Sequence, residues 1–260
     1  MIQNPASLAS IYRYPVKGLT PEQLPHVALT AGQTLPSDRS YAIENGPSGF
    51  DPAAPRHLPK SQFLMLMRNE RLAALRTHYD DAGHTLTIRE NGAETARGDL
   101  ETHEGRAAIE AFFAANFADE LRGPPRILVS PGHSFSDVAK RVASIINLAS
   151  VAALEDVIGR PVHPLRFRGN LHVAGWPAWH EFDLMDRVLR IGEIRLKVVK
   201  RIVRCAATNV DPDTAARDLT IPATLMRTYG HADLGVYAEV ISDGTISEGD
   251  AIEVVAPVLV

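Results

Sequence analysis

The sequence predicts a β-rich α+β fold with a few helices at its periphery. Short runs of β-branched and aromatic residues, separated by turn residues, recur along most of the 260 residues. Helical character is clearest over residues 102–121, where Ile109, Phe112 and Phe117 fall on one face. The length allows one large domain or two modest ones, and Gly123-Pro124-Pro125 is the expected boundary between residues 1–123 and 124–260.

In the first half, the patterning predicts strands at 7–14, 27–29, 38–43, 63–67, 72–79 and 84–89. A hairpin loop is expected at 80–83, and Asn91-Gly92 marks a further turn. Residues 45–59 are rich in glycine and proline and predict a long loop, a feature that is often functional or mobile.

In the second half, strands are expected at 126–130, 144–148, 171–174, 236–241 and 252–255, with a tight hairpin over 188–196. Ser150 suits the N-cap of a helix that ends at Gly159. Pro222 suits the first turn of a short helix that ends at Gly230.

The composition excludes several classes of protein. A net charge of −4, from 27 basic and 31 acidic residues, argues against wholesale binding of nucleic acid or anionic membranes but allows a local basic pocket. The single cysteine excludes an intrachain disulfide, a cysteine-ligated iron–sulfur cluster and a Cys₂His₂ zinc site made by this chain alone. With no signal-peptide pattern and no long apolar run, we expect a soluble cytoplasmic protein.

That cysteine, Cys205, follows an apolar segment with strand character and precedes a turn around Asp211-Pro212-Asp213. Lys200, Arg201 and Arg204 lie within five residues of it. Nearby cations favour the thiolate, the form that attacks electrophiles and binds soft metals. A lone cysteine is, however, more often a small buried hydrophobe, and this segment alone leaves both interpretations open.

Cations or amides also occur in loops or at strand ends at Lys17, Arg39 and residues 166–170. Gathered in one cleft they would bind a phosphate or another anion, whereas singly each is typical of a solvated surface. The ten histidines show no metal-ligand spacing, and the phosphate-loop, dinucleotide-binding and serine-hydrolase motifs are absent. A lysine for pyridoxal phosphate would be Lys17 or Lys200, without other local support.

Four stretches together resemble a known family. Residues 14–18 and 38–42 resemble the N-terminal β-barrel domain that precedes MOSC domains, and Arg166-Phe167-Arg168-Gly169-Asn170 resembles the Arg-Phe-Arg-Pro-Asn signature of the MOSC core. Residues 204–214 are similar to its Arg-Cys-x-x-Thr-Thr-Val-Asp-Pro-Asp-Thr motif, and residues 244–250 to its closing Gly-Thr-Ile-x-x-Gly-Asp. The resemblance covers nearly the whole chain and implies an N-terminal β-barrel-like domain packed against a MOSC β-barrel domain.

The resemblance also implies a molybdenum pterin cofactor, with the Cys205 thiolate as the metal ligand and Asp211 as a second catalytic residue that shapes or lines the site. Lys17, Arg39 and Arg168 would contact the phosphate or pterin, and Asn170 would hydrogen-bond it. Arg204 and Thr208 are the remaining expected cofactor-binding residues. The best-studied members of the family reduce N-hydroxylated compounds, so the resemblance implies release of oxygen as water and a separate ferredoxin- or cytochrome-type electron donor.

The sequence departs from the family pattern at four places. Gly18 replaces a serine, Gly169 a proline and Asn209 a threonine, and Lys140-Arg141 falls where relatives often carry small hydroxyl residues. Two other functions remain open: a non-redox module that carries the cofactor or sulfur, and a non-catalytic ligand-binding barrel with an inert Cys205.

Overall fold

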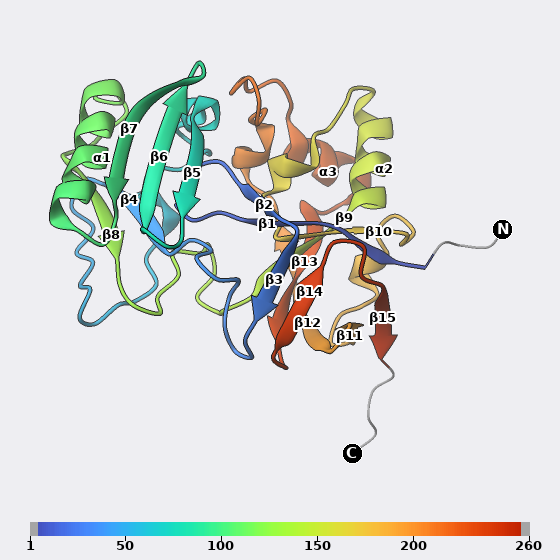
Figure 1. The fold of residues 1–260 in the computed structure, drawn as a ribbon. Helices are drawn as coiled ribbons and strands as arrows, with labels where there is room; N and C mark the ends of the chain where they lie inside the picture. The colour runs from blue at the N-terminus through green and yellow to red at the C-terminus, as the bar shows by residue number, and fades with distance from the viewer. Residues whose placement is uncertain (1–4, 256–260) are drawn as a thin grey trace.

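The computed structural model describes residues 5–255 (Figure 1). Its main element is an eight-stranded sheet with the order β15-β11-β12-β13-β9-β10-β1-β2. These strands are β1 (Ser7–Arg13), β2 (Glu22–Leu24), β9 (Ala143–Asn147), β10 (Leu171–Ala174), β11 (Val188–Ile191), β12 (Ile194–Val203), β13 (Asp233–Val240) and β15 (Ile252–Val255). A bridge between Ser7 and Ala251 joins β1 to the residue before β15, so the sheet curls back on itself.

The inner face of this sheet forms the larger core because side chains alternate between its two faces. On β12, for example, Leu196 and Val198 are fully buried while Arg195 and Lys197 are exposed. The neighbouring strands β9 and β10 run parallel, and the other pairings within the sheet are antiparallel.

A second body of structure contains the meander β5 (Arg76–Asp80), β6 (Thr85–Glu90) and β7 (Ala93–Asp99), the pair β4 (Tyr41–Asn45) and β8 (Pro125–Val129), and helix α1 (His103–Asn116). Thr102 caps α1, its Oγ1 accepting a hydrogen bond from the Gly105 N–H at 3.0 Å. Ile109, Phe112 and Phe113 are buried against the strands, as the helical spacing predicts.

The start of the chain lies in the larger sheet rather than with this second body (Figure 1). Strand β1 pairs with β10, and β3 (His26–Leu29) pairs with β14 (Gly244–Ser247). The two halves of the sequence are therefore interlocked, and the division at residue 123 stays a prediction. The β-rich α+β class is confirmed.

Helices α2 (Leu148–Ile158) and α3 (Ile221–Tyr229) pack together beside the larger sheet around Leu154, Phe167 and Leu225. Both end at a left-handed glycine, Gly159 and Gly230, as predicted. The predicted N-cap of α2 is wrong. Asn147 caps the helix, accepting from the Ala149 N–H at 3.0 Å, because the Ser150 hydroxyl is buried against Glu181 at 2.8 Å.

The predicted strand at 63–67 is also wrong. After one bridge from Phe63 to Glu44 the chain turns, because the buried Asn69 side chain accepts the Met65 N–H at 3.0 Å. A short 3-10 helix, Glu70–Ala74, then occupies the start of the next predicted strand, and residues 38–40 form a turn before β4.

No helix within residues 5–255 has the length and apolar character needed to cross a bilayer.

Candidate functional site

A cavity of about 290 Å³ opens between the two bodies of the fold. Residues 17–67 contribute one wall, residues 136–144 a second, and residues 166–170 and 200–208 the third. Eight lysine or arginine side chains line it, against two aspartates, Asp38 and Asp137. In a protein of net charge −4 this is a strong local concentration of positive charge, and it attracts anions.

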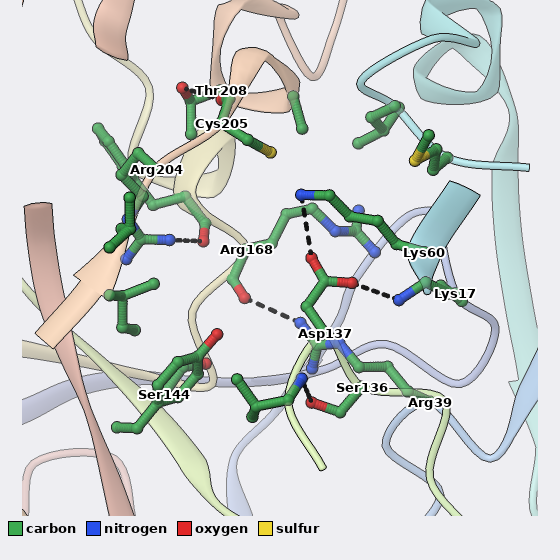
Figure 2. Close-up of a pocket in the computed structure, with 18 of the residues that line it drawn as sticks. Lys17, Arg39, Lys60, Ser136, Asp137, Ser144, Arg168, Arg204, Cys205 and Thr208 are labelled. Carbon is green, nitrogen blue, oxygen red and sulfur yellow. Dashed lines mark hydrogen bonds and ion pairs between the residues drawn. The ribbon is translucent and has the colours of Figure 1, made fainter. Parts of the chain in front are cut away.

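Cys205 lies two residues after the end of β12, at the start of the 3-10 helix Ala206–Asn209. Its carbonyl oxygen accepts hydrogen bonds from both the N–H and the hydroxyl of Thr208, at 3.0 and 2.9 Å. These bonds fix the turn and leave the half-buried thiol directed into the cavity, where it faces Lys60 and Asp137 (Figure 2). A thiol in this position is accessible to a ligand, which argues against an inert core residue.

Arg39 and Arg168 share one aromatic platform. Their guanidinium carbons lie 4.6 and 4.2 Å from the centre of the buried Tyr14 ring. Arg39 also donates to the Arg168 carbonyl at 3.1 Å and pairs with Asp38, and both arginines have left-handed backbone conformations. Burial, which the neighbouring Arg39 reinforces, lowers the pKa of Arg168 to about 10. A guanidinium that has lost solvent without gaining a carboxylate is a favourable partner for an anionic ligand.

Lys17 and Lys60 meet at one carboxylate. Lys17 Nζ is paired with Asp137 and donates to the Phe135 carbonyl at 2.8 Å, while Lys60 Nζ lies 3.9 Å from Asp137 (Figure 2). Burial lowers the pKa of Lys17, with Asp137 opposing that change. Burial also works against the Asp137 carboxylate, but the nearby Lys17, Lys60 and Arg39 outweigh it and lower its pKa to about 2. Asp137 is therefore ionised and holds both lysines in the cavity.

The side chain of Asn170, a predicted cofactor-binding residue, forms its hydrogen bonds within the protein. Asn170 accepts from the N–H and hydroxyl of Ser144, at 3.0 and 2.7 Å, and donates to the Tyr12 carbonyl and to Asp38, each at 3.1 Å. An amide has two donors and two acceptor sites, and these four contacts use all of them. Asn170 lines the cavity and holds its wall, and its predicted hydrogen bond to a cofactor stays a prediction.

Arg204 braces the same region. Its guanidinium donates to the Phe167 carbonyl at 2.8 Å and to the Leu234 carbonyl at 2.7 Å, which ties the loop before β10 to the strand beside Cys205. Burial lowers the pKa of Arg204 to about 10. The positive charge of Arg204 faces the cavity, whereas its hydrogen bonds go to backbone carbonyl oxygens.

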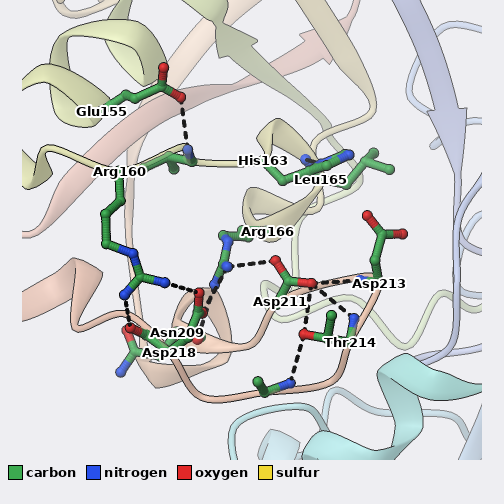
Figure 3. A network of polar contacts seen from close by, with 12 residues as sticks. Glu155, Arg160, His163, Leu165, Arg166, Asn209, Asp211, Asp213, Thr214 and Asp218 are labelled. Atoms are coloured by element: carbon green, nitrogen blue, oxygen red, sulfur yellow. Dashed lines mark hydrogen bonds and ion pairs between the residues drawn. The ribbon is translucent and has the colours of Figure 1, made fainter.

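Asp211 is not among the residues that line the cavity. Its carboxylate accepts from the Arg166 guanidinium at 2.7 Å and from the N–H groups of Asp213 and Thr214, at 3.0 and 2.9 Å (Figure 3). Burial opposes the charge, but these hydrogen bonds outweigh it and lower the pKa of Asp211. Of the two roles expected for Asp211, the structure agrees with shaping the loop that follows Cys205 rather than lining the cavity, and a catalytic role stays a prediction.

The cavity contains residues that sequence reasoning missed. Lys60 directly follows the long loop predicted at residues 45–59 and begins a 3-10 helix, Lys60–Gln62, while Asp137 lies in the loop before β9 and Ser144 lies in β9. Lys140 and Arg141 point elsewhere, to Glu239 at 2.9 Å and Gln33 at 2.6 Å. Two small hydroxyl residues nearby in the sequence, Ser136 and Ser144, line the cavity.

Two known domain families match this chain. The MOSC N-terminal beta barrel domain matches residues 5–120, and the MOSC domain matches residues 130–253. The chain belongs to the MOSC-domain proteins.

The curated proteins similar to this MOSC protein include mitochondrial amidoxime reducing components 1 and 2. Mitochondrial amidoxime reducing component 2 of Rattus norvegicus is 29% identical over 161 residues, which are 55% of this chain and 47% of that protein. Component 1 of Homo sapiens is 31% identical over 120 residues, or 42% of this chain and 35% of that protein. Component 1 of Mus musculus is 33% identical over 130 residues, or 44% and 38%. The matched segments span less than half the length of these relatives.

Two departures from the MOSC motifs have a local cause. At Gly18 the backbone φ is +87°, and a Cβ would lie 3.0 Å from the Leu64 carbonyl oxygen, so a serine there would be strained. Asn209, in place of threonine, accepts the Ile221 N–H at 2.8 Å and thereby caps the start of α3.

The third departure yields a test of packing. A Cβ on Gly169 would lie 2.2 Å from Ile146 Cγ1, so we expect Gly169→Ala to reduce the free energy of unfolding by about 1–3 kcal/mol. Urea unfolding of Gly169→Ala, Ile146→Ala and the double variant measures it. The clash predicts that the double variant loses less than the sum of the two single losses, and strict additivity would contradict it.

Proposed function

We propose that this MOSC protein binds a molybdenum pterin cofactor in the cavity and reduces small N-hydroxylated compounds with electrons from a separate protein. The observation that carries the proposal is the convergence of one accessible thiol and an excess of cations on a single cavity, from the walls formed by residues 17–67 and by residues 166–170 and 200–208.

The residues present fit such a group. A pterin cofactor with a phosphate tail is anionic, and Lys17, Arg39 and Arg168 place positive charge along one side of the cavity. A molybdenum ion is a soft-ligand metal, and Cys205 supplies the only thiolate that the chain offers. Lys17 is ion-paired with Asp137 rather than presented as a free amine, so we do not propose pyridoxal phosphate there.

The reaction consumes two electrons and two protons. The N–O bond of the N-hydroxy group breaks, the nitrogen gains one proton, and the departing hydroxyl takes the other and leaves as water. When bound, the cofactor would supply the metal that passes through two-electron oxidation changes.

The chain's own residues would orient and charge-balance this step. Cys205 would anchor the metal, and Arg39 and Arg168, stacked on Tyr14, would fix the anionic part of the cofactor. Lys60, next to both Asp137 and Cys205, carries exchangeable protons at the cavity. Burial opposes its charge, but Asp137 and Cys205 outweigh burial and raise the pKa of Lys60. Lys60 is thus a protonated group close to the thiol.

The experiment is expression in a host that makes the cofactor, followed by metal analysis and a reduction assay. We expect about one molybdenum per chain and reduction of benzamidoxime to benzamidine when a reduced viologen supplies electrons. Bound molybdenum without turnover would favour the non-redox carrier. Protein without molybdenum, after verified cofactor synthesis in the host, would contradict the proposal.

A further inference from the structure

We propose that the outer rim of the cavity, formed by Lys60, Lys200, Arg201 and Val203, is the docking surface for an acidic electron-transfer protein. The inference rests on the proposed function, because it names the face that the electron donor must reach. It does not follow from that function alone, since the donor could approach by either body of the fold.

Strand β12 carries two adjacent exposed cations on this rim. Neighbouring side chains of a strand point to opposite faces, so Lys200 and Arg201, which pair with Tyr237 and Val236, leave the strand on opposite sides. The pairing of β12 with β13 shifts register on either side of this pair, between Val198 and Lys200 and again between Arg201 and Val203. Such irregularities disrupt the sheet locally, and here both cations are exposed and line the cavity.

These cations are available to a partner. Within residues 5–255 neither Lys200 nor Arg201 forms an ion pair, in contrast to Lys140, whose ammonium is paired with Glu239. Arg201 is held by stacking over the Phe182 ring, 4.2 Å from its centre, which fixes its position without neutralising its charge. Lys60 adds a third positive charge across the cavity, with 32% of its side chain exposed.

An apolar residue lies beside these charges. Val203 is 68% exposed, the largest value among the exposed large hydrophobic residues of the described chain, and it is two residues from Cys205. Protein interfaces combine a desolvated apolar centre with a charged, hydrated rim. Electron transfer weakens steeply with distance, so a donor docked on Val203 would be well placed to deliver electrons to a metal at Cys205.

Charge complementarity selects the occupant. The whole chain carries a net charge of −4, so an acidic partner is repelled by the protein in general and attracted only where cations are concentrated. Three unneutralised or partly neutralised cations around one apolar residue fit an electron carrier with a ring of carboxylates around its redox centre.

The test is binding of an acidic plant-type [2Fe–2S] ferredoxin to the intact protein, measured by calorimetry at low and at physiological ionic strength. We expect Lys200→Glu with Arg201→Glu to weaken binding by about tenfold or more at low salt, and the difference to shrink as salt is added. The matched control is Arg195→Glu with Lys197→Glu, which reverses two exposed cations of the same strand away from the cavity. If Arg201→Glu impairs folding by removing the stacking on Phe182, the single variant Lys200→Glu is tested instead.

Equal weakening by both double variants, or no ferredoxin binding by the wild-type protein, would overturn the proposal. A higher benzamidoxime KM with reduced viologen, without weaker ferredoxin binding, would assign the rim to the substrate and also overturn it. Because binding is measured without turnover, failure of the docking surface is distinguishable from failure of the reductase function, which the viologen assay reports on its own.

Discussion

Cys205→Ser is expected to lower N-hydroxy reduction by at least about 100-fold while leaving the fold intact. Loss of even an outer-shell partner of a metal ligand costs about 10- to 100-fold in affinity or activity, and loss of the ligand itself should cost no less. A serine hydroxyl is a harder donor than a thiolate and stays protonated at neutral pH, so it replaces the shape of Cys205 but not its binding to a soft metal.

The measurements are activity, molybdenum content and X-ray absorption at the molybdenum edge. The absorption spectrum should show one sulfur ligand fewer in any molybdenum that Cys205→Ser retains. Met67→Leu is the matched control, because it removes another sulfur from the same cavity at nearly constant volume. Unchanged sulfur ligation in Cys205→Ser, or an equal loss of activity in Met67→Leu, would rule out Cys205 as the ligand.

The position of Cys205 was predictable because it depends on local pattern. Alternating apolar residues identify β12, and the Asn209 and Asp211-Pro212-Asp213 turn residues end it, which places the cysteine at a strand end. The helix α1 was predictable for the same reason, since the spacing of Ile109, Phe112 and Phe117 carries its period. The family motifs then identified Lys17, Arg39 and Arg168 as cavity residues.

What the sequence could not supply was the partner of each polar group. Asn170 and Arg204 carry the expected residue types, yet their hydrogen bonds go to Ser144, Asp38 and three backbone carbonyls from distant parts of the chain. Lys60 begins the short 3-10 helix Lys60–Gln62 and Asp137 lies in a loop, and neither segment has a periodic pattern in the sequence. The segment 63–67 failed as a strand because the amide of Asn69, four residues after Met65, competes for the backbone N–H.

The network beneath the cysteine loop explains why the motif residue Asp211 matters although it lies outside the cavity. The Arg166 side chain is 1% exposed and binds Asp211 at 2.7 Å, Asp218 at 2.8 Å and the Asn209 carbonyl at 3.1 Å (Figure 3). These three acceptors belong to the segment that follows Cys205. One buried cation thus fixes the loop that presents the thiol.

Arg166→Ala is therefore expected to lower the free energy of unfolding by about 3–5 kcal/mol, because it leaves two carboxylates without their buried counter-charge. Thermal or urea unfolding measures this. Arg160→Ala is the matched control: Arg160 binds the same Asp218 at 3.0 Å, but its side chain is 58% exposed, so its loss should cost no more than about 1 kcal/mol. Equal losses of unfolding free energy in the two variants would show that burial of Arg166 does not strengthen its contribution to stability.

The same network predicts a pH dependence with a definite sign. The pKa of Asp211 is lowered in the folded protein, so its contribution to stability is fully present above the unfolded value of about 3.9 and is lost as the pH falls through the folded value. The stability gap between wild type and Arg166→Ala should accordingly be full at pH 7 and narrow below about pH 4. A gap that persists undiminished well below that pH would mean that Arg166 stabilises the loop through its carbonyl contact and packing rather than through the carboxylates.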